Sequence, residues 1–203
     1  MDLIEKGGVV MIVIIALSLV AVVVIIERLL YFRRTRVDEE RLLGRLKNRI
    51  QERHFDEALA ICEANPSPIA SLVRVGIEHR HQSNRIVRDI IMDAANVEIP
   101  KQERFLSTLG TIASVTPLLG LLGTVTGNIR AFGVLGQVGS VADSSLLALG
   151  ISEALLTTAA GLIIAIPVIM FYNYLVSKAN YTIVRLENRV SELVLLLGIQ
   201  GED

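Results

Sequence analysis

Three long stretches of this chain contain no Asp, Glu, Lys or Arg, and they constrain its fold more than any other feature. They cover residues 7–26, 105–129 and 154–177. A helix rises about 1.5 Å per residue and needs about 20 apolar residues to cross about 30 Å of hydrocarbon, so each stretch is long enough to span a membrane. Helices are expected because lipid cannot satisfy the backbone of an open strand. The chain is therefore predicted to be an all-α membrane protein, consistent with 52% hydrophobic and 20% charged residues.

The spans divide the chain into seven segments. We expect transmembrane helices at 7–26, 105–129 and 146–174, a short N-terminal segment at 1–6, a helical domain at 27–104, a connection at 130–145 and a C-terminal helix at 175–203. The first stretch is expected to be retained rather than cleaved as a signal peptide. It lacks both a basic segment in front and a small-residue cleavage site behind.

The distribution of positive charge predicts the orientation of the chain. Of its 20 Lys and Arg residues, 15 lie between positions 27 and 104, and Arg28, Arg33, Arg34 and Arg36 follow the first span directly. Positive charge concentrates on the cytoplasmic side of membrane proteins. Residues 27–104 and the C-terminus are therefore predicted to be cytoplasmic, and the N-terminus and the 130–145 connection periplasmic.

The segment between the first two spans shows helical spacing of apolar residues at 37–51, 55–63 and 69–79. Asn84 is the expected N-cap of a longer helix, which Pro100 should kink without ending, so that the helix runs on into the second span. In the tail, apolar residues recur at helical spacing: Ile183, Leu186, Val190, Leu193 and Leu197. This apolar face is predicted to pack within the same chain, and packing between subunits is a second possibility that is compatible with the first.

Several function classes find no support in the residues. A net charge of −1 argues against nucleic-acid binding. His79 and His81 are two positions apart, so a helix would point them in different directions and they make a poor metal pair. Cys62 is expected to be a small buried hydrophobe. No catalytic motif is present, so we expect neither an enzyme nor a metal site.

The second and third spans carry faces of small residues, which allow another helix to approach closely. The expected helix-packing residues are Pro117, Gly120, Gly127, Gly150, Gly161 and Pro167. Three threonines lie on or beside these faces, at Thr124, Thr157 and Thr158. They are candidates for lining a polar path, although a threonine hydroxyl often bonds to its own helix backbone instead.

Glu153 is the one acid in the stretch from 144 to 177. A charged side chain inside a membrane is costly, so such residues usually mark a functional path. Alternatively, Glu153 marks the outer end of the span. Three helices cannot enclose a pore, so a complete path requires several copies arranged as a ring-shaped homo-oligomer.

Two runs in these spans resemble the signature of the MotA/TolQ/ExbB proton-channel family. The first run is PLLGLLGTVTG at 117–127, and the second is ISEALLTTAAGLIIAIP at 151–167. Three spans with a large segment between the first two are similar to the ExbB and TolQ branch of that family. By position, Thr124 and Thr158 match the pore threonines of the family, and Glu153 matches its third-helix glutamate.

The resemblance implies a pentamer in the bacterial inner membrane whose second and third helices line a central pore. A dimer of a single-span partner, ExbD or TolR, would thread the pore with a membrane aspartate. Protons, with no other cofactor, would drive motion that is delivered through TonB to outer-membrane transport. A TolQ-like role in envelope maintenance through TolA and a purely structural membrane scaffold are the alternatives. A self-contained solute transporter is disfavoured because the chain has no inverted repeat.

Overall fold

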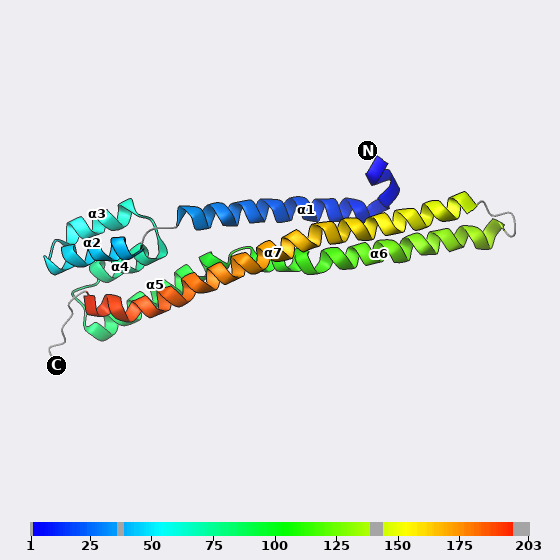
Figure 1. The fold of residues 1–203 in the computed structure, drawn as a ribbon. Helices are drawn as coiled ribbons and strands as arrows, with labels where there is room; N and C mark the ends of the chain where they lie inside the picture. The colour runs from blue at the N-terminus through cyan, green and yellow to red at the C-terminus, as the bar shows by residue number, and fades with distance from the viewer. Residues whose placement is uncertain (1, 36–38, 139–143, 197–203) are drawn as a thin grey trace. The chain divides into compact units, whose positions relative to one another are not determined.

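The computed structural model describes residues 2–35, 39–138 and 144–196, and in this part of the chain every regular element is a helix (Figure 1). The helices are α1 (Asp2–Arg34), α2 (Glu39–Gln51), α3 (Phe55–Ala64), α4 (Pro68–Glu78), α5 (Asn84–Glu103), α6 (Leu106–Val138) and α7 (Ser144–Leu196). Three helical runs are long and apolar enough to cross a membrane: Gly8–Arg34, Asn84–Gly133 and Gly150–Val194. The expectation of an all-α chain with three membrane-length helices is confirmed.

The chain forms two compact units. An apolar unit comprises Met1–Glu27 and Phe105–Leu175, and a charged unit comprises Arg28–Arg104 and Val176–Asp203. The apolar unit thus holds most of α1, all of α6 and the first part of α7. The charged unit holds α2 to α5 with the ends of α1 and α7.

Within the apolar unit, α1 bends at Gly8 and is helical beyond it (Figure 1). Gly8 has φ 60° and ψ −161°, a conformation that only glycine adopts without strain. After the bend, Met11, Ile14 and Ala21 are buried, whereas Val9, Leu19 and Val23 are exposed. One narrow face of α1 therefore packs in the unit and the remaining apolar surface is open, as expected of a helix that faces lipid.

The junction between α5 and α6 differs from the sequence prediction. Pro100 lies inside α5, which continues past it and ends at Glu103. Arg104 then has ψ 130° and Phe105 has φ 63°, and these two residues interrupt the helix before Leu106. As predicted, Pro100 does not end the helix, but the prediction that this helix continues unbroken into the second span was wrong. The predicted N-cap at Asn84 was also wrong, because Ser83 holds the N-cap position, with an extended backbone and no capping hydrogen bond from its side chain.

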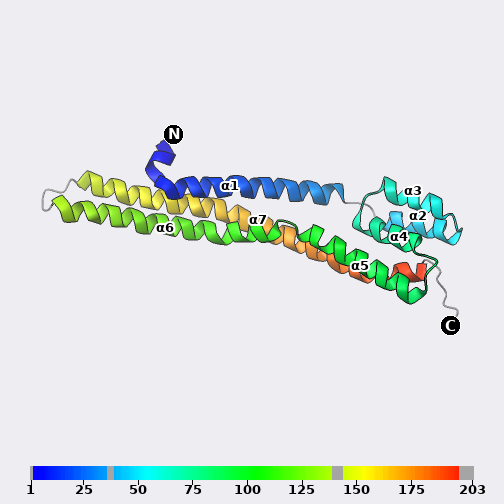
Figure 2. The ribbon, with the colours of Figure 1, turned by 180° about the vertical axis from the view of Figure 1, so that it is seen from behind.

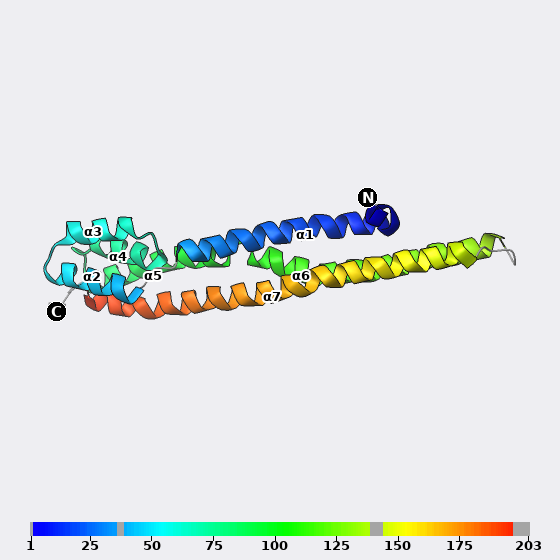
Figure 3. The same cartoon turned by 45° about the horizontal axis from the view of Figure 1, so that its top comes forward.

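The charged unit is a helical bundle (Figure 3). Its helices pack around one apolar core. The core joins α2, α3, α4, α5 and the tail of α7 through Leu42, Leu46, Ile50, Ala58, Cys62, Ile69, Ala70, Leu72, Val73, Ile77, Val87, Ile91, Ala95, Leu186, Val190 and Leu193. The three predicted amphipathic segments correspond to α2, α3 and α4. The predicted packing of the tail within its own chain is confirmed by Leu186, Val190 and Leu193, whereas Leu197 lies outside the described residues.

The thiol of Cys62 lies in this core, and burial raises its pKa to about 11. A thiol in an unfolded chain has a pKa near 8.5. The unfolded chain therefore ionises first, so the thiol's contribution to stability is complete below about pH 8.5 and falls as the pH rises towards 11.

We expect iodoacetamide at pH 8 to alkylate Cys62 slowly in the folded protein and quickly in denaturant, because the buried thiol is protonated and shielded. Mass spectrometry of timed samples measures both rates. A Cys62→Ala variant supplies the zero-reaction control, and equal rates in the two conditions would contradict the burial.

Arg28, at the end of α1, is buried in the charged unit and caps the end of α5. Its Nη1 donates a hydrogen bond to the backbone oxygen of Lys101 at 2.9 Å, and its guanidinium stacks 4.6 Å from the centroid of the Tyr31 ring. The Tyr31 hydroxyl accepts a hydrogen bond from Gln102 at 2.9 Å. A cation at the C-terminal end of a helix also interacts favourably with the helix dipole. These contacts tie the end of α1 to the last turn of α5.

We expect Arg28→Met to lower the unfolding free energy of the charged unit by about 2 kcal/mol, because it removes a charge-assisted hydrogen bond from a buried site. The measurement is the thermal denaturation of the detergent-solubilised protein. Arg33→Met removes the same charge from an exposed position in the same helix, so it controls for charge alone. An equal loss in both variants would contradict the capping role.

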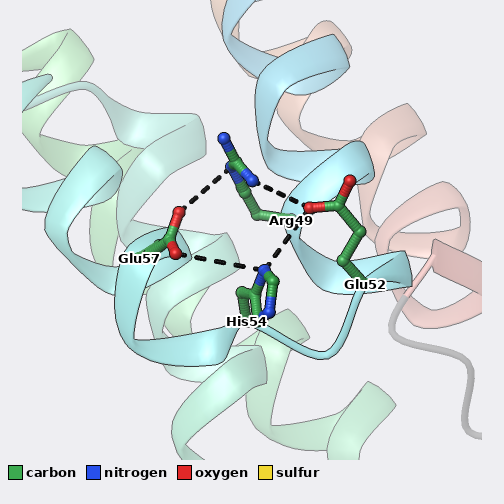
Figure 4. Close-up of polar contacts among 4 residues, drawn as sticks. All are labelled: Arg49, Glu52, His54 and Glu57. Atoms are coloured by element: carbon green, nitrogen blue, oxygen red, sulfur yellow. Dashed lines mark hydrogen bonds and ion pairs between the residues drawn. The ribbon is translucent and has the colours of Figure 1, made fainter.

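A surface cluster lies at the turn between α2 and α3 (Figure 4). Arg49 contacts Glu52 at 2.8 Å and Glu57 at 3.2 Å, and the Nδ1 atom of His54 lies 3.4 Å from Glu52. All four side chains are substantially exposed, and exposed ion pairs contribute little to stability. The cluster therefore contributes little to the stability of the turn between α2 and α3.

Candidate functional site

Helices α6 and α7 lie side by side in the apolar unit (Figure 2). They pack through a seam of small residues. A Cβ atom added at Gly120 would lie 3.1 Å from the Cα of Thr158, and one added at Gly127 would lie 2.6 Å from the Cβ of Ala154. At successive contacts the residue numbers therefore rise along α6 and fall along α7, so the two helices are antiparallel. The absence of side chains on the glycines lets the two backbones approach closely.

The seam continues in both directions along the helices. A Cβ at Gly161 would lie 2.9 Å from the backbone oxygen of Thr116, and one at Gly150 would lie 3.0 Å from the Cβ of Ala131. At the other end, a Cβ at Gly110 would lie 2.9 Å from the ring of Tyr172. Of the expected packing residues, Gly120, Gly127, Gly150 and Gly161 thus lie in this seam. Pro117 is half-buried beside it, and Pro167 is exposed.

Thr157 is buried at the centre of the seam. A Cβ added at Gly123 would lie only 2.4 Å from the Cγ2 atom of Thr157, so the threonine methyl fills the space that the glycine leaves. The Thr157 hydroxyl donates to the backbone oxygen of Glu153 at 2.9 Å. Within one chain, this threonine therefore joins the helices and fixes the turn that carries Glu153.

Thr158 makes the polar contact between the two helices. Its hydroxyl donates to the backbone oxygen of Gly120 at 2.7 Å, across the seam. This differs from the alternative in which the threonine bonds to its own helix. The Gly120 oxygen is accessible to the hydroxyl because glycine contributes no side chain there.

Thr124 behaves differently. Its hydroxyl donates to the backbone oxygen of Leu121 in its own helix, at 2.6 Å, and the residue is half-buried. The own-helix alternative therefore describes Thr124 in this chain. Since a hydroxyl oxygen retains its lone pairs when it donates, Thr124 can still accept a hydrogen bond.

Glu153 lies on α7 beside the seam and is half-buried. Its neighbour Ala154 packs against Gly127, so Glu153 is level with the part of α6 that follows Thr124. The structure thus brings the carboxylate, Thr124, Thr157 and Thr158 into one stretch of the α6–α7 pair. A threonine hydroxyl can hydrogen-bond to a carboxyl group in either of the carboxyl's protonation states, and the hydroxyl itself carries no charge.

Several seam residues were not among the expected packing residues, and they include Thr116, Gly123 and Ala154. The face of α6 that meets α7 is centred on positions 116, 120, 123 and 127, and Pro117 and Thr124 lie at its edge. Positions 116, 120, 123 and 127 are separated by three or four residues, and so are positions 117, 120, 124 and 127, so spacing alone does not distinguish the two faces. Gly123 could have indicated the correct face, because its missing side chain leaves the space that Thr157 fills.

The model of the MotA/TolQ/ExbB proton channel family matches residues 64–188, which is more than half of the chain and includes α6 and the seam of α7. The chain belongs to the MotA/TolQ/ExbB proton channel family. This description is of a proton channel and names no enzymatic reaction.

Three relatives place the chain near the ExbB and TolQ members of the family. The biopolymer transport protein ExbB-like 1 of Synechocystis is 37% identical over 85% of this chain and 68% of its own length. A biopolymer transport protein ExbB homologue of Methanothermobacter thermautotrophicus is 29% identical over 92% of this chain and 66% of its own length. The Tol-Pal system protein TolQ of Haemophilus influenzae is 40% identical over 53% of this chain and 47% of its own length. The chain is therefore a membrane protein of the ExbB/TolQ type.

Proposed function

We propose that this protein is the stator subunit of an inner-membrane proton channel that converts proton-motive force into mechanical work. Copies of the chain would form a ring, with a pentamer expected from the family. A dimer of a single-span ExbD/TolR-like partner would occupy its centre. The N-terminus would be periplasmic, and residues 27–104 and 175–203 would be cytoplasmic. The work would energise TonB-dependent transport across the outer membrane.

The observation that carries this proposal is the half-buried Glu153, which lies beside a glycine seam and one turn before Thr157, whose hydroxyl donates to the Glu153 backbone oxygen. A helix pair that serves only as an anchor has no need of an acid at this place, because a charge there is costly. Moving one proton through 100 mV releases about 2.3 kcal/mol, so several protons would supply useful work. Protons are the proposed coupling ion, with no other cofactor.

Two other functions have specific support. The 40% identity to a TolQ protein favours a Tol-Pal role, in which the work would reach a TolA-like protein. The Thr157 and Thr158 contacts favour a structural scaffold, because both side chains already serve helix packing. A scaffold would assemble in the same way but would conduct no protons.

The test is to purify the protein with each candidate single-span protein of the same organism and to reconstitute any complex in vesicles holding a pH-sensitive dye. We expect co-purification and a proton flux under an imposed gradient, above that of protein-free vesicles. A stable complex without any flux would exclude the channel and leave the scaffold. Failure of every single-span candidate to bind would overturn the proposed partner class.

A further inference from the structure

Arg130 is a positive charge in the apolar unit that the proposed proton path does not use. It is the only Lys or Arg in the stretch from 105 to 175, and the acids of that stretch are Asp143 and Glu153. The structure places Arg130 on α6, where its side chain is exposed. A charged side chain among apolar helices is costly, and such residues usually pair with one another. The surroundings of Arg130 therefore indicate what the residue serves.

Two contacts in the seam show which residues of α6 and α7 are level with each other. A Cβ atom at Gly127 would lie 2.6 Å from the Cβ of Ala154. One turn further along α6, the Cβ of Ala131 lies 3.0 Å from a Cβ atom built at Gly150. Because residue numbers rise along α6 as they fall along α7, the residue before Ala154 is level with the residue after Gly127.

This register brings Arg130 and Glu153 close together. Glu153 is the residue before Ala154, and Arg130 is likewise the residue before its seam alanine, Ala131. Their levels on the helix axis differ by about two residues, or about 3 Å. One residue of an α-helix turns the side-chain direction by about 100°, so a step back from each alanine leads to the edge of the seam. In an antiparallel pair the same step on both helices leads to the same edge. Arg130 and Glu153 therefore lie on one edge of the seam, at nearly the same level.

From this edge the guanidinium of Arg130 can reach more than one neighbour. A Cβ atom at Gly8 would lie 3.6 Å from its Nη1 atom, so in this structure the guanidinium lies against the bend of α1. Arginine carries its charge at the end of a long apolar stem. Glu153 is half-buried on the same edge, so rotation of that stem can bring the charge to the carboxylate instead.

We propose that Arg130 is the counter-charge of Glu153. The guanidinium binds the carboxylate while it is ionised, and it returns to the α1 bend when the carboxyl group has taken up a proton. The ion pair offsets part of the cost of a negative charge among apolar helices, so the acid can release its proton in each cycle. This inference rests on the proposed proton path and names the residue that makes proton release from Glu153 possible.

The first test is a double-mutant cycle on the melting temperature of the detergent-solubilised protein at pH 8. Arg130→Gln should lower the melting temperature by about 3 °C in the wild-type background and by less than about 1 °C when Glu153→Gln is already present. Equal losses in the two backgrounds would overturn the pairing. This measurement needs neither the partner nor a working channel, so its outcome does not depend on the proposed function.

Other acids of the chain supply the matched controls. The same cycle with Asp143→Asn or with Glu5→Gln removes a different acid and leaves Glu153 in place. In both backgrounds the loss caused by Arg130→Gln should keep its full size. Coupling of Arg130 to either of these acids in place of Glu153 would overturn the proposal.

The second test is proton flux in the reconstituted complex. Arg130→Gln should lower the flux about tenfold with assembly unchanged by native mass spectrometry, because the ionised carboxylate then lacks its counter-charge. Arg130→Lys keeps the charge and should retain most of the flux, so equal losses in the two variants would overturn a role for the charge. Full flux in Arg130→Gln would overturn the counter-charge and leave the proposed function standing. Absence of flux in the wild-type complex would instead overturn the proposed function, and the melting cycle would still decide the pairing.

Discussion

Replacing Gly161 with valine is expected to abolish the folded α6–α7 pair. A Cβ at this position would lie 2.9 Å from the backbone oxygen of Thr116 and 3.2 Å from the Cα of Gly120. Both neighbours are backbone atoms, so no rotamer change can relieve the clash and the helices must separate. Overpacking of this kind costs at least about 1–3 kcal/mol, and separation also breaks the Thr158 hydrogen bond to Gly120. The yield of folded protein in size-exclusion chromatography measures the loss.

The matched control for Gly161→Val is Gly133→Val. Gly133 is also a helical glycine of this pair, on α6, but a Cβ there would meet nothing within 4 Å. This variant should retain a nearly normal yield. Gly123→Ala should fall between the two, because its new Cβ meets the Thr157 side chain rather than backbone. Equal yields from Gly161→Val and Gly133→Val would contradict the seam.

The fold could be predicted from the sequence where one physical requirement acts on a long segment. Crossing a membrane demands about 20 apolar residues, so three membrane-length helices were evident from charge alone. The buried face of the α7 tail could be predicted for the same reason, from the helical spacing of its apolar residues. Leu186, Val190 and Leu193 lie in the core of the charged unit. Such patterns average over many residues and do not depend on any single backbone angle.

Features that depend on one residue could not be predicted in this way. The break between α5 and α6 lies at Arg104 and Phe105, and neither residue is a glycine or a proline that would indicate it. Pro100, where a kink was predicted, lies within α5. The positive φ of Phe105 is uncommon for a residue with a side chain, and only the packed structure reveals it. Arg28 is similar, because the sequence marks it as a positive charge near a span and the structure shows it capping α5.

The candidate site shows the same division. The spacing of small residues identified which helices meet, because Gly120, Gly127, Gly150 and Gly161 all lie in the seam. The side chains that fill the glycine gaps depend on how far each helix is rotated, and rotation by one residue exchanges Pro117 and Thr124 for Thr116 and Gly123. For the same reason, the packing role of Thr157 was visible only in the structure.

Replacing Glu153 with glutamine is expected to reduce proton flux through the reconstituted complex to the level of protein-free vesicles. Glutamine keeps the size and polarity of the side chain but cannot release or take up a proton. Glu153 is half-buried and its backbone oxygen holds the Thr157 hydroxyl, a contact that the substitution leaves in place. Assembly should therefore be unchanged by native mass spectrometry while flux is lost. Glu103→Gln, at an exposed acid near the end of α5, should leave both quantities unchanged.

Thr158 separates a packing role from a role in the proton path. Thr158→Ser keeps the hydroxyl that donates to Gly120, whereas Thr158→Val keeps the volume and removes the hydroxyl. Losing one hydrogen bond between membrane helices costs about 0.6–1.7 kcal/mol, so Thr158→Val should still assemble. If this hydroxyl also serves the path beside Glu153, flux should fall in Thr158→Val and persist in Thr158→Ser. Full flux in both Glu153→Gln and Thr158→Val would remove the proposed proton path, because neither titratable acid nor hydroxyl would then be required.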